Sequence, residues 1–130
     1  MIEILKAIPF FAQLPEDDLK AIMANVEMQY FPANYVIFEQ GQPGEIMYII
    51  KRGAVQVMRD NTILAEIKDN AFFGEMALVS DEARNATVKT VTDVELLTLG
   101  KDDFRRLLST NPGIATMVSY EVVKRANANS

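Results

Sequence analysis

One short segment of the sequence combines residue types that hold anions. Residues 72–80 read FFGEMALVS and lack the alternation typical of strands, which indicates one or two turns of helix inside a strand-rich region. Gly74 at the start permits a positive φ and lets a ligand approach the backbone closely. The first amides of such a helix, at residues 76–78, would point outward and favour an anion. Arg84, further along the chain, adds a fixed positive charge.

Glu75 narrows the chemistry of that anion. A carboxylate beside an anion is repulsive unless it binds another group, such as a hydroxyl that donates to it. A sugar phosphate carries both groups, since its phosphate suits amides and a guanidinium while its hydroxyl suits a carboxylate. A plainer interpretation stays open at this point. In it the segment is a bulge and connector, with Arg84 on the surface and Glu75 as its ion-pair partner.

The composition excludes several classes of protein. The chain has 130 residues, 49% apolar and 24% charged, as in an average globular domain. Its formal charge of −5 argues against binding to nucleic acid or to an anionic membrane surface. The chain contains no Cys and no His, so we expect no disulfide, no zinc finger, no metal cofactor and no triad hydrolase of the usual kind. No signal-like start or membrane-spanning apolar stretch is present, which predicts a cytoplasmic domain.

The spacing of apolar and turn residues predicts the elements that must position this segment. Residues 1–25 read as helices, the second beginning at Pro15 after a break at residues 9–11. Short runs rich in Val, Ile, Phe, Tyr and Thr then predict about eight strands within residues 26–99. Residues 100–130 return to helix. We therefore expect one domain over residues 1–130, mainly β, with an eight-strand roll of the double-stranded jelly-roll type and flanking helices.

Two separated motifs resemble those of a known family. FGEMAL at 73–78, followed by RNATV at 84–88, resembles the phosphate-binding cassette of the cyclic nucleotide-binding domain family. GQPG at 41–44, followed by MYII at 47–50 and Gly53, is similar to the family's other motif. The order of helices, roll and helices agrees as well. The chain is similar to the sensor domains of catabolite-activator-type regulators and of cyclic-nucleotide-regulated channels.

The resemblance implies a role for each residue of the cassette. Arg84 would pair with the cyclic phosphate through two oxygens, and Glu75 would accept a hydrogen bond from the ribose 2′-hydroxyl. The phosphate contacts would be completed by Asn85, Ala86 and Ala77, and the ribose contacts by Gly74 and Met76. Candidates for the base pocket and for a covering lid are Val36, Ile49, Val57, Met117 and Tyr120.

Two positions depart from the family pattern. Ala83 stands where the family usually has Pro, and Asn85 stands where it usually has Ser, Thr, Ala or Gln. In the family a Thr at that place commonly goes with guanine, and Ala or Ser with adenine. Asn can donate to a phosphate oxygen or to a purine edge, and we expect cAMP rather than cGMP as the ligand.

The resemblance implies a sensor that is not an enzyme and that needs no cofactor besides its ligand. Ligand binding would shift the C-terminal helices, whose apolar stripe (Ile114, Met117, Val118 and Val122) packs on the roll or pairs two subunits. The 130 residues match one sensor domain, so we expect its effector in a longer protein or in a partner. Two alternatives are a degenerate, nucleotide-free module that acts as an interaction or dimerisation scaffold, and a jelly-roll enzyme of the cupin type. This chain lacks the His ligands that the metal of such an enzyme would need.

Overall fold

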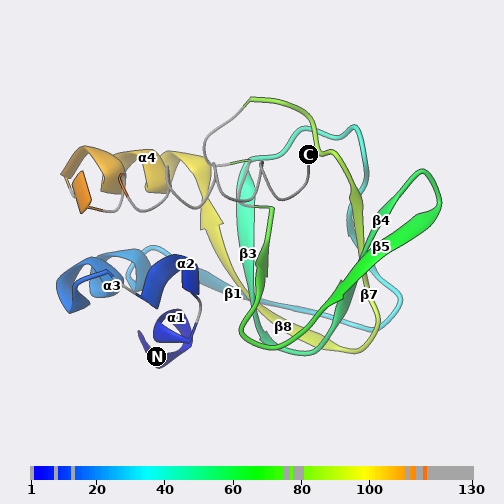
Figure 1. Ribbon diagram of the computed structural model, residues 1–130, viewed down its shortest axis with the longest axis horizontal. Coiled ribbons are helices and arrows are strands. Elements are labelled where there is room, and N and C mark those ends of the chain that lie inside the picture. The colour runs from blue at the N-terminus through cyan, green and yellow to red at the C-terminus, as the bar shows by residue number, and fades with distance from the viewer. Residues whose placement is uncertain are drawn as a thin grey trace. The chain divides into compact units, whose positions relative to one another are not determined.

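The computed structural model describes residues 2–7, 9–12, 14–74, 77, 81–110, 112–113 and 116 of the chain (Figure 1). The helices assigned within these residues are α1 (Ile2–Lys6), α2 (Pro9–Ala12), α3 (Glu16–Met23) and α4 (Lys101–Thr110). The strands assigned there are β1 (Glu27–Phe31), β2 (Val36–Phe38), β3 (Ile46–Arg52), β4 (Val55–Arg59), β5 (Thr62–Ile67), β6 (Phe72–Phe73), β7 (Thr87–Thr90) and β8 (Val94–Gly100). The prediction of a mainly β fold with eight strands and flanking helices is confirmed.

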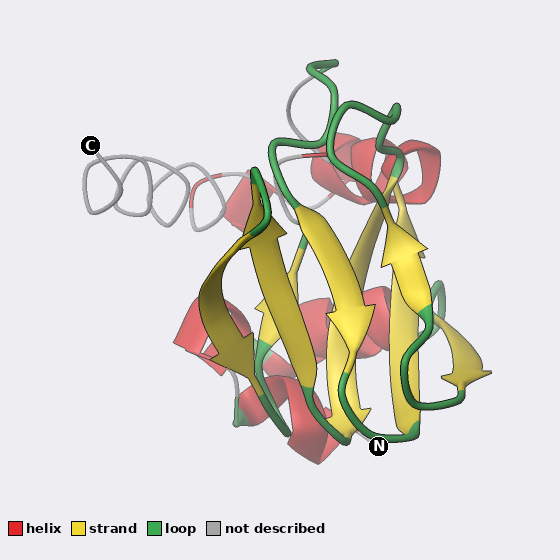
Figure 2. Cartoon of the chain, turned by 90° about the vertical axis from the view of Figure 1, so that its right-hand side faces the viewer, coloured by secondary structure: helices red, strands yellow, loops and turns green. Residues whose placement is uncertain are grey.

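The strands pair as if the chain were folded in half and then rolled up. The first strand pairs with the last, β2 with β7, β3 with β6 and β4 with β5, and every pairing is antiparallel. Two further pairings, β3 with β8 and β4 with β7, complete two four-stranded sheets of order β1-β8-β3-β6 and β2-β7-β4-β5. This nested pairing defines the jelly roll. Figure 2 shows its strands in yellow, lying side by side.

The chain turns back on itself at the two-residue turn between β4 and β5. Asp60 and Asn61 both have positive φ, at 51° and 65°, as a type I′ hairpin turn requires. Short polar side chains tolerate this left-handed conformation better than other residues with a Cβ. The sequence predicts a strand over Thr62–Ile67 after this turn, and β5 has those bounds.

The interior of the roll is apolar and is built from inward-facing residues of both sheets. The buried cluster contains Tyr48, Ile50, Val55, Phe73, Val88, Val94 and Leu96, and partly buried residues such as Phe31, Phe38 and Val57 pack against it. Successive residues of a strand point to opposite faces. Tyr48 and Ile50 therefore face this cluster, whereas Ile49 between them faces away from it.

The chain divides into two compact units, one of residues 1–25 and 102–130 and the other of residues 26–101. In the first unit α3 buries Leu19 and Ile22, and α4 buries Phe104 and Leu107. The residues of the expected apolar stripe, Ile114, Met117, Val118 and Val122, lie outside the described residues. Of the helices that the structure describes, none has the length and apolar character needed to cross a membrane.

Three local predictions differ from the structure. Phe72 and Phe73, expected in a helical turn, form β6 opposite Ile49 and Tyr48, because pairing with β3 satisfies backbone groups that so short an apolar run cannot satisfy alone. Residues 9–11, expected as a break, belong to α2, which Pro9 begins. Pro15, expected as the first residue of the next helix, is the N-cap of α3.

The burial of these residues predicts that two leucines on different strands contribute very differently to the free energy of unfolding. Leu96 of β8 is 0% exposed, whereas Leu64 of β5 is 50% exposed. We expect Leu96→Ala to lower the free energy of unfolding by about 2–5 kcal/mol, because it removes apolar contacts and leaves a cavity. The same substitution at Leu64 should change it by about 0.5 kcal/mol. Urea unfolding of both variants measures the difference, and equal losses would contradict the core described above.

Candidate functional site

The nested pairing brings the two motifs of the sequence into contact. The connector from β2 to β3 and the connector from β6 to β7 leave strands that pair with each other, so they meet at one end of the roll. Two backbone hydrogen bonds join them. The amide of Gly41 donates to the carbonyl of Arg84, and the amide of Arg84 donates to the carbonyl of Gln42, both at 2.8 Å. The position of Arg84 is therefore fixed by its main chain.

The side chain of Arg84 lies inside the protein, with only 9% of the residue exposed. Its Nη2 donates to the carbonyl oxygen of Ile46 at 2.7 Å, and its Nη1 donates to that of Gly74 at 3.3 Å. Its Cζ lies 4.0 Å from the centre of the Phe38 ring. These three contacts help to orient the guanidinium. The alternative that expected Arg84 on the surface is wrong.

Two glycines provide the space that this side chain occupies. A Cβ at Gly44 would lie 2.5 Å from Nε of Arg84, and a Cβ at Gly74 would lie 2.9 Å from its Nη1. Gly74 also has a φ of 76°, in the left-handed region that favours glycine. Each of the two sequence motifs thus contributes one glycine to the slot around Arg84.

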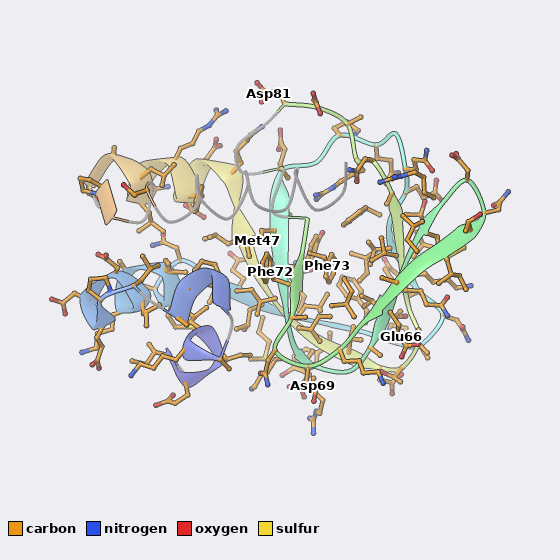
Figure 3. All side chains as sticks on the ribbon, viewed as in Figure 1. Met47, Glu66, Asp69, Phe72, Phe73 and Asp81 are labelled. Carbon is orange, nitrogen blue, oxygen red and sulfur yellow. The ribbon has the colours of Figure 1, made fainter. Side chains whose placement is uncertain are left out.

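Three aromatic rings line the interior next to Arg84. Tyr48 stacks on Phe73 with ring centres 4.9 Å apart, and Phe38 meets these two rings in tilted contacts at 5.9 and 6.0 Å. Phe73 is labelled in Figure 3, on the short strand that leads into Gly74. Burial raises the pKa of the Tyr48 phenol above its ordinary value of 10.0, and the positive charge of Arg84 opposes this rise. Tyr48 is therefore a neutral neighbour of the guanidinium at physiological pH.

The comparisons with known proteins agree with this geometry. A family model described as the cyclic nucleotide-binding domain matches residues 28–111, which include both motifs and every residue of the described strands except Glu27. The chain belongs to the cyclic nucleotide-binding domain family. The resemblance inferred from the motifs is thus confirmed. This family consists of ligand-binding domains, so the chain is a binding domain and not an enzyme, which sets aside the cupin-type alternative.

Individual relatives cover nearly all of the chain. A cyclic nucleotide-gated potassium channel of Mesorhizobium japonicum is 37% identical over 126 residues, which are 97% of this chain and 35% of the channel. The N-terminal domain of a transcriptional regulator from Streptomyces coelicolor matches with a TM-score of 0.85 at 28% identity, over 99% of this chain and 93% of that one. The regulatory domain of Toxoplasma gondii PKA, solved with cAMP, matches with a TM-score of 0.76 at 27% identity. This match covers 82% of this chain and 42% of that one. The chain spans about a third of the channel's length.

The structure brings several of the predicted cassette residues of this cyclic nucleotide-binding domain together. Gly74 and Arg84 are in direct contact, and Ala77, which is buried, donates its amide to the carbonyl of Gly74 at 3.1 Å. Ala86 is buried just before β7, while Asn85 is exposed and accepts a hydrogen bond at its carbonyl from Nε of Arg59 at 2.9 Å. The predicted residues Glu75, Met76, Met117 and Tyr120 lie outside the described residues.

The three predicted base-pocket residues on the strands lie in different surroundings. Val57 of β4 packs against the interior cluster that also contains Tyr48 and Phe73. Val36, at the start of β2, is 39% exposed. Ile49 is fully buried, on the face of β3 opposite to Tyr48, so the structure does not place it with the residues around Arg84.

Two groups that hold Arg84 have no counterpart in the sequence prediction. Ile46 contributes only its backbone carbonyl, which any residue at that position would supply, so residue type gives no signal. Phe38 lies in an apolar strand and looks like an ordinary core residue. The one signal for Phe38 is its place at the end of a strand directly before the turn that carries Gly41.

An ion pair links the cassette connector to the start of α4. Lys101, the first residue of α4, is 8% exposed, and its Nζ lies 2.5 Å from Oδ1 of Asp81. Its backbone amide donates to the carbonyl of Glu45 at 2.8 Å. Figure 3 shows Asp81 at the end of the roll opposite to Asp69. Lys101 thus contacts both of the connectors that meet at Arg84.

The slot around Arg84 predicts a different outcome for the same substitution at two glycines. Gly44→Ala should lower the free energy of unfolding by about 1–3 kcal/mol, because its Cβ must displace the Arg84 side chain from Ile46 and Phe38. At Gly113 a Cβ would meet only an ordinary contact, 3.6 Å from Oδ2 of Asp18, and Gly113→Ala should not destabilise the protein. Thermal unfolding compares the two variants, and a crystal structure of Gly44→Ala shows where Arg84 has gone. An unmoved Arg84 would overturn this account of Gly44.

Proposed function

We propose that this cyclic nucleotide-binding domain is a cAMP sensor that signals through its C-terminal helices. The observation that carries the proposal is the buried guanidinium of Arg84, held where the two family motifs meet. A guanidinium in a mostly apolar surrounding attracts a phosphate more strongly than one in water, since the local dielectric constant is lower. The cytoplasmic location expected from the sequence belongs to this proposal as well.

In the proposed complex Arg84 pairs with the cyclic phosphate, and the neighbouring cassette residues complete the site. Asn85, Ala86 and Ala77 contribute to the phosphate contacts. Gly74, Glu75 and Met76 hold the ribose, with the carboxylate of Glu75 accepting from the 2′-hydroxyl. Val57 and Val36 contribute to the base pocket, and Met117 or Tyr120 covers the base.

We favour cAMP over cGMP for two reasons. The related regulatory domain from Toxoplasma gondii was solved with cAMP, and it matches over 82% of this chain. Position 85 carries Asn and not the Thr that goes with guanine in the family. The exposed Asn85 side chain is free to turn toward a ligand, where its amide can donate to a phosphate oxygen.

Removing the guanidinium tests the binding site directly. We expect Arg84→Ala to weaken cAMP binding by about 2–5 kcal/mol, which is at least about thirtyfold in Kd, because a buried charge-assisted contact is lost. Arg106→Ala removes an exposed arginine that pairs with Asp103 on α4 and serves as the matched control. Isothermal titration calorimetry with cAMP and cGMP measures both variants and the unmodified domain. Absence of binding to the unmodified domain would instead support the nucleotide-free scaffold.

One ion pair supports the proposed signal to the C-terminal helices. The ion pair between Asp81 and Lys101 joins the connector that precedes Arg84 to the first residue of α4. A cassette that rearranges around a bound nucleotide would pull on this ion pair and bias the start of α4. The helices would pass the change to an attached effector or to a partner, including a second copy of the chain paired through the C-terminal helix.

Breaking the ion pair tests this route. Lys101→Met keeps the length of a side chain that is 9% exposed and removes its charge, while the Asp81 side chain, 87% exposed, remains solvated. We expect cAMP to change hydrogen exchange of the α4 amides in the unmodified domain, and to change it at least about twofold less in Lys101→Met. Lys68→Met, which removes an exposed lysine paired with Glu66, is the control. An equal response of α4 in all three proteins would contradict the proposed route.

A further inference from the structure

We propose that Arg59 is a positioning residue for phosphate recognition, because its hydrogen bond to Asn85 sets the direction of the peptide unit between Asn85 and Ala86. The proposal rests on the cAMP site proposed above, in which Ala86 contributes to the phosphate contacts. Alanine has no polar side-chain group, so this contact has to come from the backbone amide. Arg59 acts through that peptide unit and does not itself touch the phosphate.

The hydrogen bond holds one side of the peptide unit toward the outside of the roll. Arg59 is the exposed last residue of β4, in the hairpin drawn in green in Figure 1. Its Nε donates to the carbonyl oxygen of Asn85 at 2.9 Å. In a trans peptide the carbonyl oxygen and the N–H of the next residue point in opposite directions. The described part of the chain has no cis peptide bond, so the amide of Ala86 points away from Arg59.

The direction of this peptide unit decides whether it attracts or repels an anion. An N–H directed at a phosphate oxygen forms a charge-assisted hydrogen bond, whereas a carbonyl oxygen in the same place repels the phosphate. A rotation of the peptide unit by half a turn would exchange the two groups. That rotation would break the hydrogen bond with Arg59. Arg59 therefore keeps the amide of Ala86, and not the carbonyl of Asn85, on the side away from the hairpin.

The peptide unit lies between two points that backbone hydrogen bonds fix. On one side, the main chain of Arg84 is bonded to the connector between β2 and β3. On the other side, Thr87 begins β7 and pairs with Met58, the residue before Arg59. The pairing of β4 with β7 thus brings Arg59 next to the end of the cassette, where its side chain supplies a hydrogen bond to the connecting peptide.

The tip of the hairpin is held in place as well. The amide of Asp60 donates to Oε1 of Gln40 at 3.2 Å, and Oδ1 of Asp60 accepts from Nε2 of Gln40 at 3.3 Å. The amide of Gln40 in turn donates to Oγ1 of Thr87 at 2.9 Å. These bonds fix the backbone from which the Arg59 side chain extends. The hairpin belongs to neither sequence motif, and in this proposal it supports the phosphate site from outside.

Arg59→Met removes the donor and keeps a long unbranched side chain at an exposed position. We expect the Kd for cAMP to rise roughly three- to tenfold, because the peptide unit loses the bond that fixes its direction. The melting temperature of the ligand-free domain should stay within about 3 °C, since an exposed side chain is exchanged. Arg106→Met, which removes the same charge from an exposed arginine paired with Asp103, is the matched control and should leave the Kd unchanged.

Phosphorothioate analogues of cAMP separate this role from a general attraction by the charge of Arg59. Sulfur replaces one or the other exocyclic phosphate oxygen in the two diastereomers, which carry the same charge, and sulfur accepts hydrogen bonds more weakly than oxygen. The amide of Ala86 would contact one of these oxygens. Arg59→Met should therefore weaken binding by less than about twofold for the diastereomer with sulfur at that oxygen, and by the full factor for the other.

Calorimetric titrations of the unmodified domain and both variants with cAMP and the two analogues measure these factors. An unchanged Kd for cAMP in Arg59→Met would overturn the positioning role and leave the proposed function standing. Equal weakening for cAMP and for both diastereomers would assign Arg59 to general charge attraction and would also overturn it. An unmodified domain that does not bind cAMP would overturn both proposals.

Discussion

The nested antiparallel pairing of the strands is the constraint on which the rest of this structure depends. Because β2 pairs with β7 and β3 pairs with β6, the two connectors between these pairs have to meet. Sheet hydrogen bonds thus bring together motifs that lie far apart in the sequence, and the bonds of Arg84 to Gly41 and Gln42 complete their contact. The pairing in turn depends on the tight turn at Asp60 and Asn61, which sets the register of the central hairpin.

Burying an arginine is expensive unless its donors are satisfied, and this determines what surrounds the site. The carbonyl oxygens of Ile46 and Gly74 accept hydrogen bonds from the terminal nitrogens of Arg84, and the ring of Phe38 lies against its guanidinium. Such contacts require the backbone to come close to the side chain, and Gly44 and Gly74 provide that closeness. One glycine of each motif is thus explained by one buried side chain.

Much of this arrangement could be predicted from the sequence, and the exceptions share a physical cause. The spacing of strands and turns predicts the roll, and residue types predict that Arg84 and Gly74 belong to an anion site. The sequence misplaces Phe72–Phe73 because the strand that pairs with them is distant, so no local periodicity reports it. It misses Ile46 because a carbonyl has no signature in residue type. It misses Phe38 because burial in a core and support of a cation require the same apolar aromatic residue.

The first residue of β3 and the residue before it contact both Arg84 and the first residue of α4. The carbonyl of Ile46 accepts from Arg84, and the carbonyl of Glu45, one residue earlier, accepts from the amide of Lys101 at the start of α4. Consecutive Cα atoms are about 3.8 Å apart across a rigid peptide plane. A displacement of Arg84 that tilts the peptide after Ile46 therefore acts within one residue of the hydrogen bond that anchors α4. The ion pair of Lys101 with Asp81 reaches the same residue from the cassette connector, so both connectors contact a single residue at the start of α4.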